Sequence, residues 1–128
     1  MSGAFSADWL ALREPFDRIA RARTLAARLV QHLPPRPRII DLGAGTASLF
    51  RWLAPMIGRA QAWTIVDADA ALLGEAFART ADWAEARGWR LELFGRDAMR
   101  LKRGEIALTV SRGEVCAVPT RLPADAGR

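Results

Sequence analysis

The amino-acid sequence predicts an α/β fold, and three observations support this class. Residues 38–42 and 63–67 are short apolar stretches of the kind that form buried strands. A glycine-containing turn and an apolar, helix-type segment lie between them, as two parallel strands joined by a helix require. After Gly88 the pattern changes to alternating apolar and polar residues separated by glycines, which predicts strands joined by tight turns.

The segment before the first strand is predicted to be helical. A short helix over residues 8–12 should break near Pro15, because proline lacks the backbone N–H that a helix interior uses. A second helix is expected over residues 17–33. The prolines within residues 34–37 end it and stiffen the entry to the first strand.

Two further helices are predicted around the second strand. The helix that follows the glycine turn should stop within residues 55–58, where proline and glycine stand close together. The next helix is expected over residues 70–87, with Asp69 as a candidate N-cap and Gly88 as its C-terminal stop. Its predicted apolar face comprises Leu73, Phe77, Ala81 and Ala84.

The C-terminal part leaves two arrangements open. In the first, residues 89–94 form the third parallel strand. In the second, which we favour, hairpins are inserted at this point and the third parallel strand is formed by residues 106–110 or 115–118. Either way we expect one domain over residues 1–128. It would comprise a helical leader (1–37), a ligand-binding core (38–88) and a β-rich segment (89–128).

The turn after the first strand has the composition of a nucleoside-binding loop. Asp41 precedes Gly43 and Gly45, and glycine lets the backbone turn sharply while a ligand lies directly against it. Asp67 ends the second strand, where a carboxylate can accept both ribose hydroxyls. A dinucleotide site would need a third glycine where Ser48 stands. The same turn also occurs in α/β proteins without a cofactor, so a structural role stays open.

These residues resemble the first motif of the class I S-adenosylmethionine-dependent methyltransferases, an acid followed by Gly-x-Gly-x-Gly. Asp41, Gly43 and Gly45 match the motif, and Ala47 replaces its last glycine. Residues 7–17 and the Trp-Leu-Ala-Pro sequence of residues 52–55 are similar to a bacterial subgroup of that family. The resemblance extends from about Trp9 to about Leu73 and implies a Rossmann-like methyltransferase fold, an incomplete three-layer parallel sheet with N-terminal helices. To this the glycine-punctuated alternation after Gly88 adds a C-terminal β-hairpin or meander region.

The resemblance also implies a site and a cofactor, S-adenosyl-L-methionine. Its methionine part would lie along Gly43, Ala44, Gly45 and Thr46, with Asp41 orienting the loop and the ammonium group. Asp67 would hold the ribose and Ala68 would contact the adenine. Two further contacts are implied, from Arg13 to the methionine carboxylate and, if residues 89–94 are the third parallel strand, from Asp97 to the adenine amino group. Trp83 and Trp89 are expected to pack in the core.

Composition argues against several other kinds of site. Cys116 and His32 are the only residues of their types, which disfavours a disulfide, a metal centre and a Cys-His dyad, and His32 is expected at a helix end. The formal net charge is +5, but without a dense basic run nucleic-acid binding rests on net charge alone. No segment has the length of apolar sequence that a membrane span needs, so we expect a cytoplasmic protein.

The function expected from the sequence is therefore the cofactor-binding part of a methyltransferase that acts on an unknown methyl acceptor. No residue after Val118 offers the second half of such a sheet, so we expect a fragment that is inactive by itself, and no general base can be named. Two alternatives stay open. One is a binding or assembly module that associates with itself through an open sheet edge, and the other is a basic nucleic-acid-associated domain.

Overall fold

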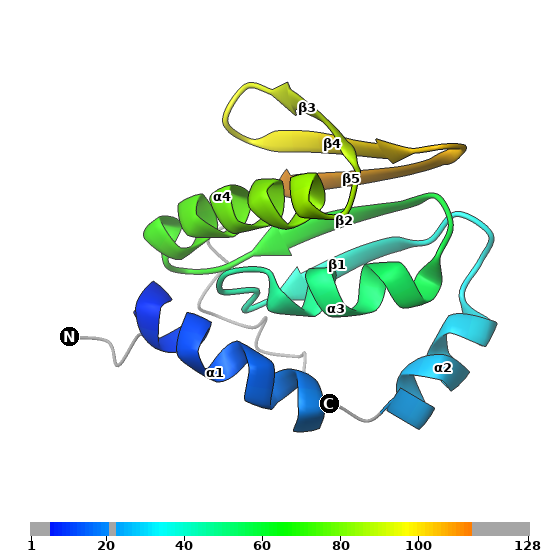
Figure 1. Ribbon diagram of the computed structural model, residues 1–128, viewed down its shortest axis with the longest axis horizontal. Coiled ribbons are helices and arrows are strands. Elements are labelled where there is room, and N and C mark those ends of the chain that lie inside the picture. Colours follow the sequence, from blue (N-terminus) through cyan, green and yellow to red (C-terminus); the bar gives the residue numbers. More distant parts are fainter. Residues whose placement is uncertain (1–5, 21–22, 114–128) are drawn as a thin grey trace, which may run out of the picture.

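The computed structural model describes residues 6–20 and 23–113, except for the side chains of residues 15–20. This part of the chain forms an α/β fold with a five-stranded mixed sheet (Figure 1). Its elements, in chain order, are α1 (Ala7–Ala20), α2 (Arg23–His32), β1 (Arg38–Leu42), α3 (Ser48–Ile57), β2 (Gln61–Val66), α4 (Ala70–Ala86), β3 (Arg90–Phe94), β4 (Ala98–Arg103) and β5 (Ile106–Arg112).

The sheet has a parallel half and an antiparallel half. The strand order is β1-β2-β5-β4-β3, with β1, β2 and β5 parallel to one another. The hairpin β3–β4 is antiparallel and continues the sheet beyond β5. The expectation that residues 89–94 form the third parallel strand is therefore wrong, and the inserted hairpin with a strand at residues 106–110 is confirmed. The alternative strand at residues 115–118 lies outside the described residues.

The core lies between the sheet and helices α3 and α4. Phe50 of α3 meets the ring of Trp63 edge-on at 5.3 Å and that of Trp83 at 5.9 Å, between ring centroids. The sheet contributes every second residue to this core, because side chains alternate between the two faces of a strand. The buried sheet residues of the core are Trp63, Ile65, Met99, Leu101, Leu108 and Val110. Trp83 and Trp89 are also buried, so their expected core role is confirmed.

One expectation about the helices is corrected. Helix α1 runs through Pro15 to Ala20, so the predicted break near Pro15 is wrong. One proline removes a single backbone hydrogen bond, which the residues on either side can outweigh.

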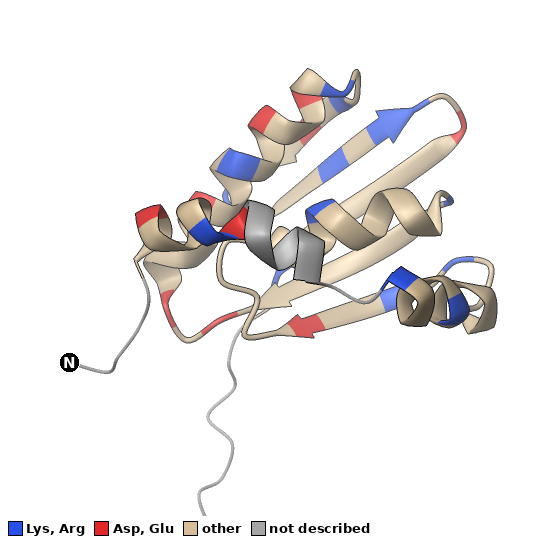
Figure 2. Ribbon diagram, turned by 60° about the horizontal axis from the view of Figure 1, so that its bottom comes forward, with Lys and Arg blue, Asp and Glu red and all other residues tan. Residues whose placement is uncertain are grey.

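The predicted three-layer parallel sheet is also wrong. Within the described residues, α3 and α4 cover one face of a mixed sheet, and the helices stand on one side of it in two views (Figures 1 and 2).

The opposite face, which we call the open face, carries apolar and basic side chains. Ile40 and Leu42 on β1 are 67% and 76% exposed, and Phe94 on β3 is 54% exposed. Arg90 on β3, opposite Lys102 on β4, lies in the same alternation as Phe94. Basic positions recur along this end of the sheet (Figure 2). This face therefore includes the outer surface of the inserted hairpin β3–β4.

Candidate functional site

The predicted glycine loop lies at the carboxyl ends of β1 and β2. Gly43 and Gly45 have φ angles of 70° and 57°, which glycine adopts without the steric penalty of a Cβ atom. Ala44 N–H donates to the carbonyl of Val66 at 2.9 Å and so ties the loop to the next strand. A Cβ atom on Gly45 would lie 3.5 Å from Cδ1 of Leu10, so α1 packs against this loop.

The carboxylate of Asp67 accepts hydrogen bonds from two backbone N–H groups. Its Oδ2 accepts from Gly45 N–H at 2.8 Å, and its Oδ1 accepts from Asp69 N–H at 2.9 Å. The expected N-cap role of Asp69 is confirmed, since its side chain accepts from the N–H groups of Ala71 and Leu72. The structure therefore brings Asp67 and the glycine loop together, with both carboxylate oxygens already holding backbone donors.

The other predicted site residues lie around this loop. Asp41 is half-buried on β1 and Ala44 is half-buried in the turn, while Gly43 and Ala68 are exposed. Thr46 is buried, and its carbonyl accepts from the guanidinium of Arg51. The binding of S-adenosylmethionine, or of any other nucleoside, by these residues stays a prediction.

Three remaining predicted residues have other surroundings. The guanidinium of Arg13 lies 4.7 Å from the centre of the Trp9 ring, a cation–π contact within α1. Asp97 is exposed in the β3–β4 turn, and its backbone carbonyl accepts from Arg112 N–H at 2.8 Å. His32 is the last residue of α2, which confirms its expected place at a helix end.

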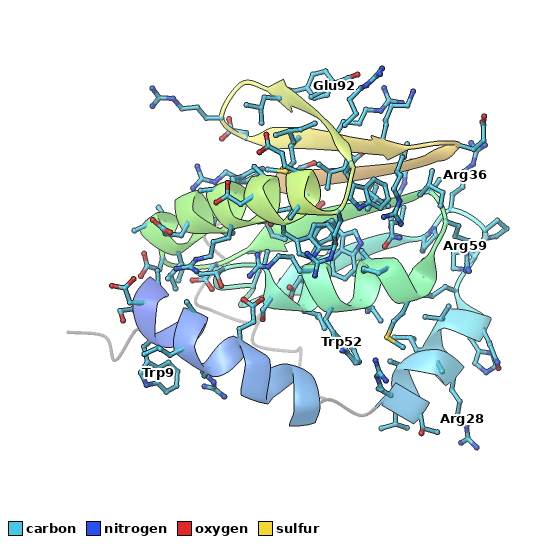
Figure 3. The ribbon with its side chains drawn as sticks, in the orientation of Figure 1. Trp9, Arg28, Arg36, Trp52, Arg59 and Glu92 are labelled. Carbon is cyan, nitrogen blue, oxygen red and sulfur yellow. The ribbon has the colours of Figure 1, made fainter. Side chains whose placement is uncertain are left out.

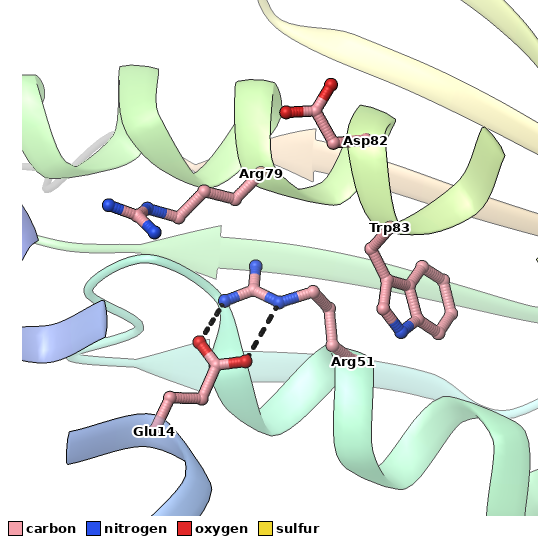
Figure 4. Close-up of a pocket in the computed structure, with 5 residues that line it drawn as sticks. All are labelled: Glu14, Arg51, Arg79, Asp82 and Trp83. Atoms are coloured by element: carbon pink, nitrogen blue, oxygen red, sulfur yellow. Dashed lines mark hydrogen bonds and ion pairs between the residues drawn. The ribbon is translucent and has the colours of Figure 1, made fainter. Parts of the chain in front are cut away.

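A buried ion pair joins α1 to α3 beside a cavity of about 280 Å³ (Figure 4). Arg51 Nη2 lies 2.6 Å from a carboxylate oxygen of Glu14, and Arg51 also donates to Thr80 Oγ1 at 3.3 Å. Arg51 is 6% exposed, so its charge is shielded from water and depends on these partners. Arg79 and Asp82 of α4 also line this cavity. The pair of opposite charges fits a structural role.

The hairpin β3–β4 builds a second, basic pocket of about 350 Å³. Arg90 and Lys102 lie directly opposite each other in the hairpin register and line this pocket together with Arg103. The guanidinium of Arg103 sits 4.3 Å from the centre of the Trp89 ring and donates to the carbonyl of Arg87 at 3.2 Å. We call Arg90, Lys102 and Arg103 the hairpin cations.

Reasoning from the sequence missed the hairpin cations. They are separated along the chain, so the sequence shows no dense basic run. The signal that could have found them is the hairpin itself: a turn at residues 95–97 sets residue 90 opposite residue 102. Pairing two alternating strands around that turn would have set Arg90 opposite Lys102, with Arg103 next to Lys102 along β4.

The described residues give two further findings. In residues 6–20 and 23–113, no group of three or more His, Cys, Asp or Glu side chains could hold a metal ion. None of the helices in this part of the chain is long and apolar enough to cross a membrane.

Comparison with known proteins finds similarity to a curated protein. No family model and no solved structure matches the chain. The chain is 34% identical over 110 residues to a protein named ribonuclease D from Nitrobacter hamburgensis. The match covers 80% of this chain and 28% of that protein, so the chain spans about 28% of the length of its curated relative.

This relative overturns the resemblance to methyltransferases and the methyl-transfer function drawn from it. The motif that carried the resemblance is local. A strand, a glycine turn and a helix need residues of these types in many α/β proteins. In this structure Asp67 braces that turn through Gly45 and Asp69, which accounts for the acid without any cofactor.

Proposed function

We propose that this domain binds single-stranded RNA along the β3–β4 hairpin, with the hairpin cations holding backbone phosphates. The single observation that carries the proposal is the direct cross-strand pairing of Arg90 and Lys102 in an open pocket that Arg103 also lines. Like charges directly opposite each other on a sheet destabilise it by up to about 1 kcal/mol. The pairing of Arg90 with Lys102 therefore costs free energy of folding, and a phosphate anion between the cations would offset that cost.

The chemistry of the three side chains suits phosphate. Arginine presents a planar fork of N–H donors that matches two phosphate oxygens, and lysine adds a compact point charge. Arg103 is held in place by the Trp89 ring and by the Arg87 carbonyl, so part of the entropy cost of ordering its side chain is met before binding. All three side chains are exposed at the surface, where a long polyanion can reach them.

An aromatic side chain on the same strand supports a single-stranded ligand. Phe94 is 54% exposed and lies two alternations along β3 from Arg90, on the same face. Every base has a flat face that can stack on an exposed aromatic ring, whereas bases within a duplex are already stacked. Arg100 lies between them on β4, opposite Glu92, which points outward from the sheet in Figure 3.

The charge of the chain and the name of its relative both agree with this proposal. The formal net charge is +5 and the sequence pI is about 11.1, which favours polyanionic partners. The relative's name, ribonuclease D, refers to RNA as the substrate of that protein. Because the chain spans about 28% of that relative, the proposal is limited to RNA binding by this domain and does not include cleavage.

The proposal is tested by measuring fluorescence anisotropy of a short labelled single-stranded RNA at low salt. The double variant Arg90→Glu/Lys102→Glu should bind at least about tenfold more weakly, because two attractive contacts become repulsive. The matched control is Arg23→Glu/Arg28→Glu, the same change of net charge at two exposed positions on α2, where Arg28 points away from the sheet (Figure 3). Equal losses in both double variants would show that only net charge matters and would contradict a site on the hairpin.

A further inference from the structure

Another pocket lies at the opposite end of the β3–β4 hairpin from the hairpin cations, between α4 and the β3–β4 turn. Its volume is about 370 Å³ and most of its lining is apolar. Phe77 of α4 and the buried Met99 of β4 line it, and Leu93 lines it from the edge strand β3. Leu93 is 65% exposed, so this apolar surface is in contact with water in the structure.

The pocket is open because the facing helix carries small residues. Gly74, Ala78 and Ala81 of α4 line it at helical spacing, so little side-chain volume projects toward the hairpin. A Cβ atom on Gly74 would meet nothing within 4 Å, and the same holds for Gly95 in the turn. A pocket of this volume has room for a flat group, and a side chain added at Gly74 can fill it without moving the backbone.

Two cations stand at this pocket. Arg96 lies in the β3–β4 turn, and Arg112 ends β5. The Arg112 guanidinium lies 5.6 Å from the centre of the Phe77 ring and donates to the carbonyl of Ala70 at 3.0 Å, which fixes its position. An apolar slot beside two guanidinium groups is complementary to a flat aromatic group that carries an anion, which is the chemistry of a nucleotide.

We propose that this pocket takes one unstacked base of the RNA whose backbone lies on the hairpin cations. This inference rests on the proposed function and names a base-recognition site for it. Strand β3 is the edge of the sheet, so a bound RNA can pass around this edge from the open face to the pocket. Arg90 and the pocket residue Leu93 are three positions apart on β3, roughly 10 Å in a strand, so one RNA can reach both the phosphate site and the base site.

The test compares an RNA with the same RNA lacking its bases at every position, which has the same backbone charge. The native chain should bind the base-free strand about tenfold more weakly. Gly74→Leu fills the pocket, and it should bind the base-free strand as the native chain does while losing much of the preference for bases. Leucine favours a helix more than glycine does, so this variant is expected to fold. Ala27→Leu, at an exposed position on α2, is the matched control and should keep the native preference.

The outcomes separate this inference from the proposed function. If Gly74→Leu keeps the full native preference for bases, that preference arises elsewhere, for example at Phe94, and the pocket proposal is overturned while RNA binding stands. If the native chain binds both strands equally well, the pocket proposal is again overturned and phosphate binding stands. If the native chain binds neither strand, the proposed function fails and the base site fails with it.

Discussion

Arg51 is the residue through which the leader helix, the glycine loop and α4 are joined. Its guanidinium contacts Glu14 of α1, the carbonyl of Thr46 in the loop and Thr80 of α4. A buried guanidinium is tolerated only when its donors are satisfied in this way. The glycine loop is thus held in place by Arg51, which lies outside the glycine motif.

Removing the negative charge at Glu14 should destabilise the fold. Glu14→Gln leaves the buried Arg51 cation without its counter-charge, and we expect a loss of about 3 kcal/mol in the free energy of unfolding. Urea denaturation measures this loss. Glu75→Gln is the matched control, because Glu75 and Arg79 form a partly exposed pair at 3.7 Å and the expected loss is below about 0.5 kcal/mol. Equal effects in the two variants would show that the buried pair has no special role.

Asp67 offers a second test at this scale. Asp67→Ala removes the acceptor for two backbone N–H groups, and we expect a loss of about 1–3 kcal/mol in the free energy of unfolding. Asp67→Asn keeps one acceptor oxygen and should lose less. An Asp67→Ala chain as stable as the native chain would show that this acid does not brace the loop. Ligand binding would then be the better explanation for an acid at this position.

Some of these roles could be predicted from the sequence and others could not. The cap at Asp69 and the stop at Gly88 depend on neighbouring residues, so local rules find them. The bond between Asp67 and Gly45 joins residues far apart in the chain, and the sequence shows only that both belong to one kind of turn. The partner of Arg51 is set by how α1 packs, which no local pattern encodes.

At the scale of elements, the β3–β4 hairpin decides the shape of the sheet. Its strands were expected from their alternation, and an inserted hairpin was the favoured arrangement. The register, and with it the meeting of Arg90 with Lys102, depends on which residues form the turn. The run of α1 through Pro15 escaped prediction because proline signals a break only on average.

The passage of the chain out of β5 provides a test of element packing. A Cβ atom on Gly113 would lie 2.7 Å from Cγ2 of both Thr64 and Val66, which are stiff β-branched residues of β2. We expect Gly113→Ala to destabilise the fold by about 1–3 kcal/mol. The same substitution at Gly74, which has open space around it, should stabilise α4 by up to about 1 kcal/mol. Thermal denaturation of the two variants would show shifts of opposite sign, and shifts of the same sign would contradict this packing.

At the scale of the whole molecule, the helices of residues 6–20 and 23–113 lie on one face of the sheet, and apolar and basic side chains of the strands lie on the other. Net charge was visible in the sequence, but its placement was not, because the hairpin cations come from two strands. The methyltransferase expectation failed at this scale as well. It depended on the strand–turn–helix unit, which many α/β proteins share, and the hairpin that carries the proposed site was predicted as an element without a role in binding.

The most direct test of RNA binding at the hairpin is the salt dependence of the association constant for a short single-stranded RNA. If the hairpin cations contact three phosphates, the logarithm of that constant should fall with the logarithm of salt concentration at a slope of about −2. Arg90→Ala/Lys102→Ala should reduce the slope to about −0.7, because one phosphate contact remains. An unchanged slope in this variant, or native binding that does not respond to salt, would contradict the proposed site.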